Sequence, residues 1–337
     1  MGSQHRLAPS GFDRGASVAV GFLSVAAAAL GAVPAGAAPY DDTRAKVDRL
    51  YAQAEKATEA YNEADERADE LRAEVGTARD RIARQQQRIN SMRDSLGSLA
   101  GAQYRSGGID PSLALLFSED PDDYLDKASR LDRVTAHQAG ELKDLQDAMR
   151  ELAQEREEAT GKLRELEQSR KAVAAHKKTV EQKLAAARRL LDSLPDDERD
   201  AYDRASRSGR TGMPDLGSAT AASGRGAAAV AAARSALGRP YVWGANGPTG
   251  FDCSGLMQWS YAQAGVSLPR TSQAQRFAGR QVPLSEARPG DLVVYRSDAS
   301  HVGMYMGNGQ VIHAPYPGAP VRYDPVGMMP VSSVTRV

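Results

Sequence analysis

Two long heptad seams constrain the fold of this chain more than any other feature. Apolar residues recur at alternating steps of three and four from Val47 to Leu99, and again from Leu142 to Leu194. This spacing is typical of helices that pack along one seam. Each seam covers 53 residues, or about 80 Å of helix at 1.5 Å per residue. Their equal length predicts two antiparallel helices lying side by side.

The turn of this hairpin is expected around Gly107-Gly108 and Pro111, with a short apolar patch at 113–117 and a helix from Pro121 onward at the tip. The first seam is rich in alanine, which packs closely but buries little area, so we expect a slender rod. Three cations interrupt the second seam: Arg156, Arg170 and Lys177. They indicate a helix that is not fully committed to its hairpin partner.

The first 37 residues have the pattern of a secretory signal peptide. Arg6 and Arg14 precede an uncharged, alanine-rich stretch that ends in Ala35-Gly36-Ala37. Cleavage after Ala37 is favoured, because cleavage one residue later would leave Pro39 first. The alternative is an uncleaved membrane anchor, which the weak hydrophobicity of the stretch disfavours. We therefore expect a secreted protein of the cell wall or the extracellular space.

Composition separates a helical front from a compact back. The 43 Lys+Arg balance the 43 Asp+Glu, which excludes a general polyanion binder, and no nucleic-acid partner is expected. Aromatic residues make up only 6%, and both tryptophans, Trp243 and Trp259, lie in the last third. One core shared by the whole chain is therefore not expected. The expected organisation is a signal peptide over 1–37, a coiled-coil hairpin over 38–205, a flexible linker over 206–226 and a globular domain over 227–337.

The two main parts carry opposite charge. Residues 227–337 hold nine Arg, no Lys and five Asp+Glu, whereas residues 38–226 hold 32 basic and 37 acidic residues. A basic module is attracted to an anionic polymer. The opposite signs also permit the rod to dock on the globular domain. The rod is then either a restraint on that domain or a plain spacer.

Cys253 is the only cysteine of a chain expected to be exported. It cannot form an internal disulfide, so it is a buried residue without a chemical role, one half of an intermolecular disulfide, or a reactive thiol. The sequence predicts a helix that begins at Cys253, with Asp252 in the capping position and Gly265 at the stop. The positive end of a helix dipole lowers a thiol pKa and favours the nucleophilic thiolate.

A thiol nucleophile needs a base, and His301 and His313 are the candidates. The other three histidines lie in the signal peptide or on the rod: His5, His137 and His176. Strands are expected from His301 to Met306 and from Gln310 to Ala314. A three-residue loop between them would place both histidines on one face of the hairpin. A two-residue turn at Asn308-Gly309 would place them on opposite faces. The residues leave both registers open, and a catalytic pair requires the longer loop.

Six segments in this order resemble the successive motifs of the NlpC-type cell-wall cysteine peptidases. They are Tyr241–Gly244, Phe251–Leu256, Leu268–Ser272, Pro289–Leu292, His301–Gly303 and Gly307–Gly309. The resemblance covers the back third, with Ala245 standing where the family often has a second glycine. The layout of signal peptide, helical rod and C-terminal domain is similar to that of secreted bacterial peptidoglycan endopeptidases.

The resemblance implies an α+β papain-like domain preceded by an all-α antiparallel coiled-coil hairpin. It implies that Cys253 is the nucleophile, His301 the general base and acid, and His313 the polar residue that orients His301. Tyr241 would lie near the oxyanion site, and Asp252 and Ser254 would border the substrate groove. Neither a metal nor a cofactor is implied.

The implied reaction is hydrolysis of peptidoglycan stem peptides, between the γ-carboxyl of D-glutamate and the following diamino acid. The coiled coil would regulate or position the enzyme, through a membrane protein or a regulatory protein of the division machinery. Alternatives are a zinc site formed by Cys253, His301 and His313, an amidase or acyltransferase on the same scaffold, and a wall-binding module without catalysis.

Overall fold

The computed structural model describes residues 38–105, 121–207 and 220–337. The expected signal peptide, the hairpin turn with its apolar patch at 113–117, and most of the expected linker lie outside the described residues. Within the described ranges, no helix combines the length and the apolar character needed to cross a membrane.

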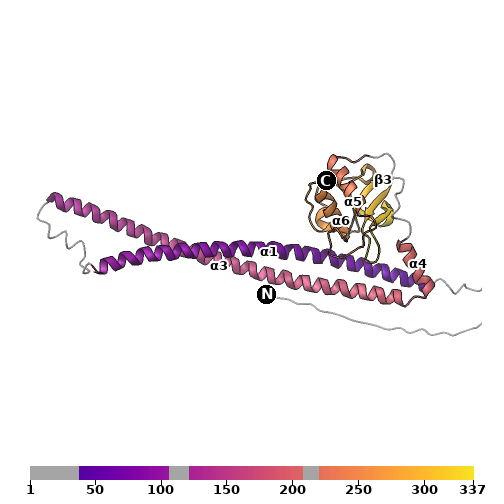
Figure 1. The fold of residues 1–337 in the computed structure, drawn as a ribbon, viewed down its shortest axis with the longest axis horizontal. Coiled ribbons are helices and arrows are strands. Elements are labelled where there is room, and N and C mark those ends of the chain that lie inside the picture. The colour runs from indigo at the N-terminus through magenta and orange to yellow at the C-terminus, as the bar shows by residue number, and fades with distance from the viewer. Residues whose placement is uncertain (1–37, 106–120, 208–219) are drawn as a thin grey trace, which may run out of the picture. The chain divides into compact units, whose positions relative to one another are not determined.

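Two long helices form the front of the chain. Helix α1 spans Ala38–Arg105 and helix α3 spans Pro121–Asp192, and the two run side by side (Figure 1). Leu71 packs with Leu166, and Ile89 packs with Leu152. Early residues of α1 thus meet late residues of α3, so the predicted antiparallel hairpin is confirmed. The predicted start of the second helix at Pro121 is also confirmed, and proline is favoured in the first helical turn.

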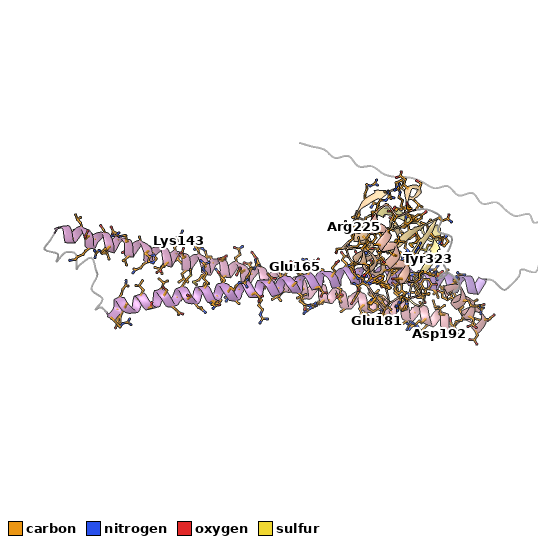
Figure 2. All side chains as sticks on the ribbon, turned by 45° about the horizontal axis from the view of Figure 1, so that its top comes forward. Lys143, Glu165, Glu181, Asp192, Arg225 and Tyr323 are labelled. Carbon is orange, nitrogen blue, oxygen red and sulfur yellow. The ribbon has the colours of Figure 1, made fainter. Side chains whose placement is uncertain are left out.

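Apolar contact between α1 and α3 is confined to separate clusters. The seam cations Arg156, Arg170 and Lys177 are all exposed, and Arg156 donates to Gln86 of α1. Other charged side chains of α3, including Lys143, Glu165 and Glu181, are exposed as well (Figure 2). Such interrupted burial gives the hairpin limited hydrophobic stabilisation.

Two short helices follow. Helix α4 spans Asp196–Arg207, and helix α5 spans Gly224–Ser235. Helix α5 begins three residues before 227, the expected start of the globular domain, because the side chain of Ser223 caps it by accepting from the N–H of Gly226 at 3.0 Å.

Helix α6, Cys253–Gln263, begins at the predicted residue. The carboxylate of Asp252 caps it by accepting from the N–H of Gly255 at 2.6 Å, and Gly265 beyond its end has φ +71°. Both predicted boundary residues are therefore confirmed. A further single-turn helix, α7, spans Ser272–Gln275.

A six-stranded antiparallel sheet completes the domain, in the order β1-β6-β2-β3-β4-β5. The strands are β1 Arg280–Val282, β2 Leu292–Tyr295, β3 His301–Gly307, β4 Gln310–His313, β5 Arg322–Pro325 and β6 Val331–Arg336. Two 3-10 turns, Leu284–Glu286 and Val326–Met328, lie between strands. The main core joins α5 and α6 to the sheet, through residues such as Ala233, Leu256 and Met304. The predicted α+β domain behind a helical hairpin is confirmed.

The hairpin between β3 and β4 corrects the expectation that a catalytic pair of histidines requires the longer loop. Gly307 pairs with Gln310, so the turn is the two-residue Asn308-Gly309 and not the longer loop. Both turn residues have positive φ, +47° and +67°, which suits a tight hairpin turn. The register shifts between Tyr305 and Gly307, and the extra residue restores the parity that the short turn removes. The two histidines consequently share one face after all.

Candidate active site

The thiol of Cys253 lies at the first residue of α6 and is 1% exposed. The backbone behind it is tightly packed, because a Cβ on Gly255 would lie 2.2 Å from the carbonyl oxygen of Ala245. A glycine two residues after the cysteine therefore lets the helix start approach this neighbouring segment. The backbone N–H groups of a helix start can stabilise negative charge on a reacting carbonyl oxygen.

A chain of hydrogen bonds runs away from the thiol through two histidines. His301 Nε2 lies 2.8 Å from His313 Nδ1, and His313 Nε2 lies 2.8 Å from Asp324 Oδ2. Arg322 donates to the same oxygen of Asp324 at 2.8 Å. The structure thus brings together His301 and His313 as predicted, and it adds Asp324, which the sequence analysis did not single out.

The direction of these hydrogen bonds follows from charge. Burial lowers the pKa of His313 to about 4, because it outweighs the opposing effect of the hydrogen bond to Asp324. The His313 ring is therefore neutral. Burial alone would raise the pKa of Asp324, but His313 and Arg322 lower it to about 2. The Asp324 carboxylate therefore accepts from Nε2–H of His313, whose Nδ1 accepts from Nε2–H of His301. This leaves Nδ1 of His301 as the nitrogen available to exchange protons with the reacting groups.

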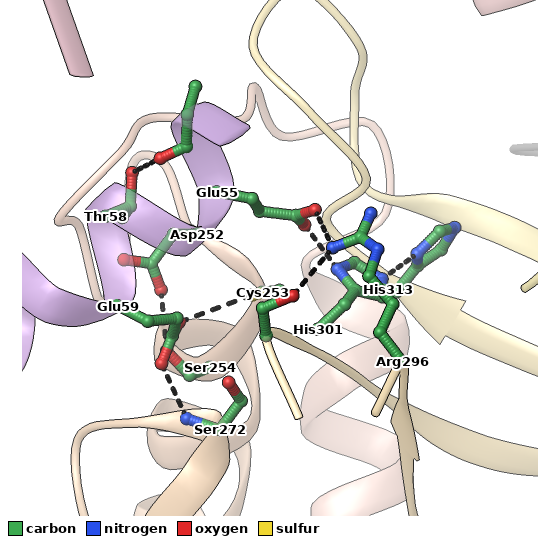
Figure 3. Close-up of polar contacts among 12 residues, drawn as sticks. Glu55, Thr58, Glu59, Asp252, Cys253, Ser254, Ser272, Arg296, His301 and His313 are labelled. Atoms are coloured by element: carbon green, nitrogen blue, oxygen red, sulfur yellow. Dashed lines mark hydrogen bonds and ion pairs between the residues drawn. The ribbon is translucent and has the colours of Figure 1, made fainter. Parts of the chain in front are cut away.

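A carboxylate of helix α1 is bonded to Nδ1 of His301. Oε1 of Glu55 bonds His301 Nδ1, and Oε2 of Glu55 accepts from Arg296 at 2.7 Å (Figure 3). Burial would raise the pKa of Glu55, but His301 and Arg296 outweigh it and hold that pKa below its usual value. The Glu55 carboxylate therefore holds the one ring nitrogen of His301 that His313 leaves available. In this form His301 cannot accept a proton from Cys253.

A second carboxylate lies one turn further along α1. Oε1 of Glu59 accepts from the Ser254 hydroxyl at 2.7 Å and lies 3.5 Å from Cys253 Sγ, while Oε2 accepts from the N–H of Ser272 at 2.7 Å (Figure 3). Glu55 and Glu59, hereafter the carboxylate pair, are 3% and 2% exposed. The pair fills the space in front of the thiol.

Further contacts hold this stretch of α1 against the catalytic domain. Asn62 donates to Asp252 at 3.1 Å, and Lys56 pairs with Asp298 at 3.2 Å. Two aromatic contacts flank the carboxylate pair: Tyr51 stacks on Tyr316 and Tyr61 meets Trp243 edge to face, with ring centroids 5.0 and 5.2 Å apart. The contact is therefore polar at its centre and aromatic at both ends, and aromatic residues are enriched in protein interfaces.

The docked helix overturns the prediction of a lowered thiol pKa. Burial raises the pKa of Cys253 well above its usual value, and the charges of Glu59, Glu55 and Asp252 raise it further. A helix dipole contributes only a partial charge, whereas three nearby carboxylates and burial all oppose the thiolate. In this form the cysteine is held as a thiol.

The three residues predicted near the oxyanion site or the substrate groove all lie beside the thiol, but their contacts differ. Asp252 is fully buried, caps α6 and forms an ion pair with Arg270 at 2.5 Å. Ser254 accepts from Arg270 at 3.0 Å and donates to Glu59. Tyr241 is 6% exposed, and burial followed by the charge of Cys253 raises its pKa well above the usual value. Asp252 is therefore a structural residue of the site, through its cap of α6 and its ion pair with Arg270.

Metal ligation does not account for these contacts. In the described part of the chain, one group with three possible metal ligands is found: Glu55, Cys253 and His301, whose donor atoms lie within 4.8 Å of one another. Its carboxylate is already bound by His301 and Arg296. A zinc site including His313 does not fit either, because both ring nitrogens of His313 are bonded to His301 and Asp324.

Sequence reasoning missed the carboxylate pair because it followed the other face of α1. Tyr51, Glu55 and Glu59 recur at steps of four, which places them on one face of the helix. Two tyrosines around this stretch, in a rod otherwise poor in aromatic residues, were the available signal for a second contact surface.

Comparison with known proteins covers both parts of the chain. The family model described as the NlpC/P60 family matches residues 238–334. A probable endopeptidase of Mycobacterium tuberculosis is 33% identical over 91% of this chain and 93% of its own length. A probable endopeptidase of Corynebacterium glutamicum is 48% identical over 35% of this chain and 56% of its own length. The solved structure of the peptidoglycan hydrolase RipB from Mycobacterium tuberculosis is 37% identical, covers 33% of this chain and 64% of its own, and has a TM-score of 0.32.

The match to the mycobacterial relative extends through the helical hairpin, and the family model falls on the domain that carries Cys253, His301 and His313. The chain therefore belongs to the NlpC/P60 family, a family of cysteine peptidases.

Proposed function

We propose that this protein is a peptidoglycan hydrolase that cuts stem peptides by cysteine catalysis. The observation that carries this proposal is the alignment of Cys253 at a helix start with His301, His313 and Asp324, in a chain of the NlpC/P60 family. Relatives that align with the chain are named probable endopeptidases, and RipB is named a peptidoglycan hydrolase.

The mechanism requires the carboxylate pair to leave. Nδ1 of His301 then accepts the thiol proton, and the thiolate of Cys253 attacks the scissile carbonyl carbon. Backbone N–H groups at the start of α6 stabilise the oxyanion. The protonated His301 gives its proton to the leaving amine, and it next activates water to release the acyl group from Cys253. His313 and Asp324 hold the His301 ring and its tautomer throughout.

The bond that we propose is cut lies between the γ-carboxyl of D-glutamate and the following diamino acid. This assignment follows from the resemblance of the motifs, and the fold itself does not fix the substrate. Digestion of purified peptidoglycan followed by mass spectrometry of the fragments tests it. A new amine on the diamino acid supports the assignment, whereas release of intact stem peptides from the glycan would indicate an amidase instead.

We also propose that the coiled coil inhibits the catalytic domain, and that it is more than a spacer. The supporting observation is that Glu55 takes the Nδ1 position of His301 while Glu59 lies against Cys253. Restraint suits an enzyme that cuts the cell wall and must be active only at chosen places. A spacer alone would not need two buried carboxylates in the active site, whose desolvation is unfavourable.

Export and a regulatory partner complete the proposal. The segment 1–37 has the pattern of a signal peptide, which supports a location in the cell wall or outside the cell. A membrane or division-machinery protein that binds the coiled coil could draw α1 from the active site. Fractionation of cells that produce the full-length chain, with N-terminal sequencing of the exported form, tests the location and the cleavage after Ala37.

A further inference from the structure

Arg296 lies at the active site although no motif pointed to it. It follows β2 and has φ +64°, a left-handed conformation that is uncommon for a residue other than glycine. Its N–H is bonded to the carbonyl oxygen of Pro330 at 2.8 Å, which helps to hold this conformation. Residues in sparsely populated backbone conformations persist where the structure over-determines them, and they cluster at ligand sites.

The backbone turns the side chain of Arg296 toward the catalytic histidine. Its guanidinium donates to Glu55 at 2.7 Å and to the Ser300 hydroxyl at 3.1 Å, and the side chain is only 24% exposed. The two oxygens of one carboxylate thus join Arg296 to Nδ1 of His301 (Figure 3). Any group that replaces Glu55 there lies beside the nitrogen that protonates the leaving amine.

We propose that Arg296 binds a carboxylate of the leaving diamino acid, and that Glu55 occupies the place of this carboxylate when α1 is docked. The inference rests on the proposed function, because it takes the leaving residue to be a diamino acid. Such a residue can present its α-carboxylate where the stem peptide ends with it. A diaminopimelate-type residue can also present the carboxylate of its side chain.

Charge and space both support a carboxylate at this position. A guanidinium has a rigid fork of donors that matches a carboxylate and remains charged at every relevant pH. Once Glu55 leaves, the nearby acidic side chain is Asp298, whose Oδ1 accepts from the N–H of Ser300 at 3.3 Å. In the docked form a cavity of about 560 Å³ lies beside Arg296 and His313, and side chains of α1, including Glu55, form part of its wall. When α1 leaves, this wall leaves with it, and the surface beside Arg296 and His313 is open to the rest of a leaving residue.

The test uses the full-length chain carrying Glu55→Ala and Glu59→Ala, so that the carboxylate pair no longer competes. Four peptides with a γ-D-glutamyl bond are compared. The first has diaminopimelate with both carboxylates free, the second has its α-carboxylate amidated, the third has its side-chain carboxylate amidated, and the fourth has lysine amide and no carboxylate at this residue.

In this background, Arg296→Gln should lower kcat/KM by roughly tenfold to a hundredfold for peptides that keep the recognised carboxylate, as expected for a hydrogen bond to a charged group. It should leave the lysine amide peptide nearly unchanged. The singly amidated peptides show which carboxylate is bound. Arg296→Lys should recover part of the loss. Arg280→Gln removes the same charge from exposed edge strand β1 and should have no effect.

An equal loss on all four peptides, or no loss on any, would overturn the role of Arg296. Circular dichroism and thermal melting check that the variants are folded. Failure of the proposed function has a different signature, since the unrestrained chain would then cleave none of the peptides. Calorimetric binding of the same peptides to the chain with Cys253→Ala still tests Arg296 in that case. Binding that does not discriminate carboxylate from amide would reject the inference.

Discussion

Replacing Glu55 by glutamine should release the restrained enzyme. Glutamine has nearly the same shape, but it removes the negative charge that bonds both His301 and Arg296. Glu55 is 3% exposed and Arg296 keeps its charge, so the change leaves a partly buried cation without its carboxylate. The docked form of α1 should therefore lose stability, while the undocked form is hardly affected.

The size of the effect follows from the buried ion pair. Removing one partner of a buried pair destabilises by about 3–5 kcal/mol. We take about 3 kcal/mol from this range, because the Arg296 side chain is 24% exposed and the glutamine oxygen can still accept from it. Each 1.4 kcal/mol changes an equilibrium by about tenfold, so the ratio of docked to undocked chain should fall by roughly a hundredfold. The gain in activity ends when the chain is fully undocked.

Two readouts follow this equilibrium. The first is the rate at which iodoacetamide alkylates Cys253, the only cysteine, which is 1% exposed in the docked form. The second is the release of peptides from purified peptidoglycan at equal molarity. Both rates should rise together in Glu55→Gln. The matched control is Glu63→Gln, which removes an exposed carboxylate from the same helix and should change neither rate.

The reasoning fails if Glu55→Gln is folded and yet alkylated and active at the rates of the unchanged chain. Such a result would mean that α1 leaves the active site freely, and the coiled coil would then act as a spacer. A rise in alkylation without a rise in hydrolysis would separate the two proposals, because it would show release of α1 from a site that does not cut the wall.

Three further outcomes are expected. In the Glu55→Gln background, Cys253→Ala should abolish wall hydrolysis without changing the melting temperature much, and residual activity would end the cysteine mechanism. His313→Ala should lower kcat more than His313→Gln, because glutamine keeps a hydrogen-bonding group. Asp324→Asn should lower kcat roughly tenfold with KM unchanged, since one hydrogen bond of about 1.5 kcal/mol orients the His313 ring. Full activity of His313→Ala would refute the role of His313 in orienting His301. Burial and then Asp252 raise the pKa of Glu59 from 4.5 to about 7 in the docked form, with Arg270, Ser254 and Ser272 opposing. The docked form therefore binds the extra proton, and docking should weaken as the pH rises from about 4.5 to 7, by up to about 3 kcal/mol. Alkylation of Cys253 should rise over this range relative to Glu59→Gln, and parallel pH profiles would contradict the assignment.

The sequence alone determined the parts of this protein that depend on local patterns. Heptad spacing predicted the antiparallel helices, because burial along a seam imposes its period on the residues. Capping chemistry located the start of α6 at Cys253, since Asp252 can satisfy the free N–H groups there. The short list of histidines then directed attention to His301 and His313.

Tertiary structure decided what no local pattern encodes. The sequence left both turn lengths open, and the extra residue between Tyr305 and Gly307 gave the two histidines a shared face with the short turn, which the sequence analysis had not considered. Asp324 joined them only because β5 pairs with β4, and Arg296 only because its backbone bends toward His301. Above all, Glu55 met His301 across 246 positions of the sequence. In the sequence, a glutamate that becomes buried cannot be distinguished from one that stays in solvent. Its charge follows no periodic pattern, and the cation that it pairs with is distant in the chain.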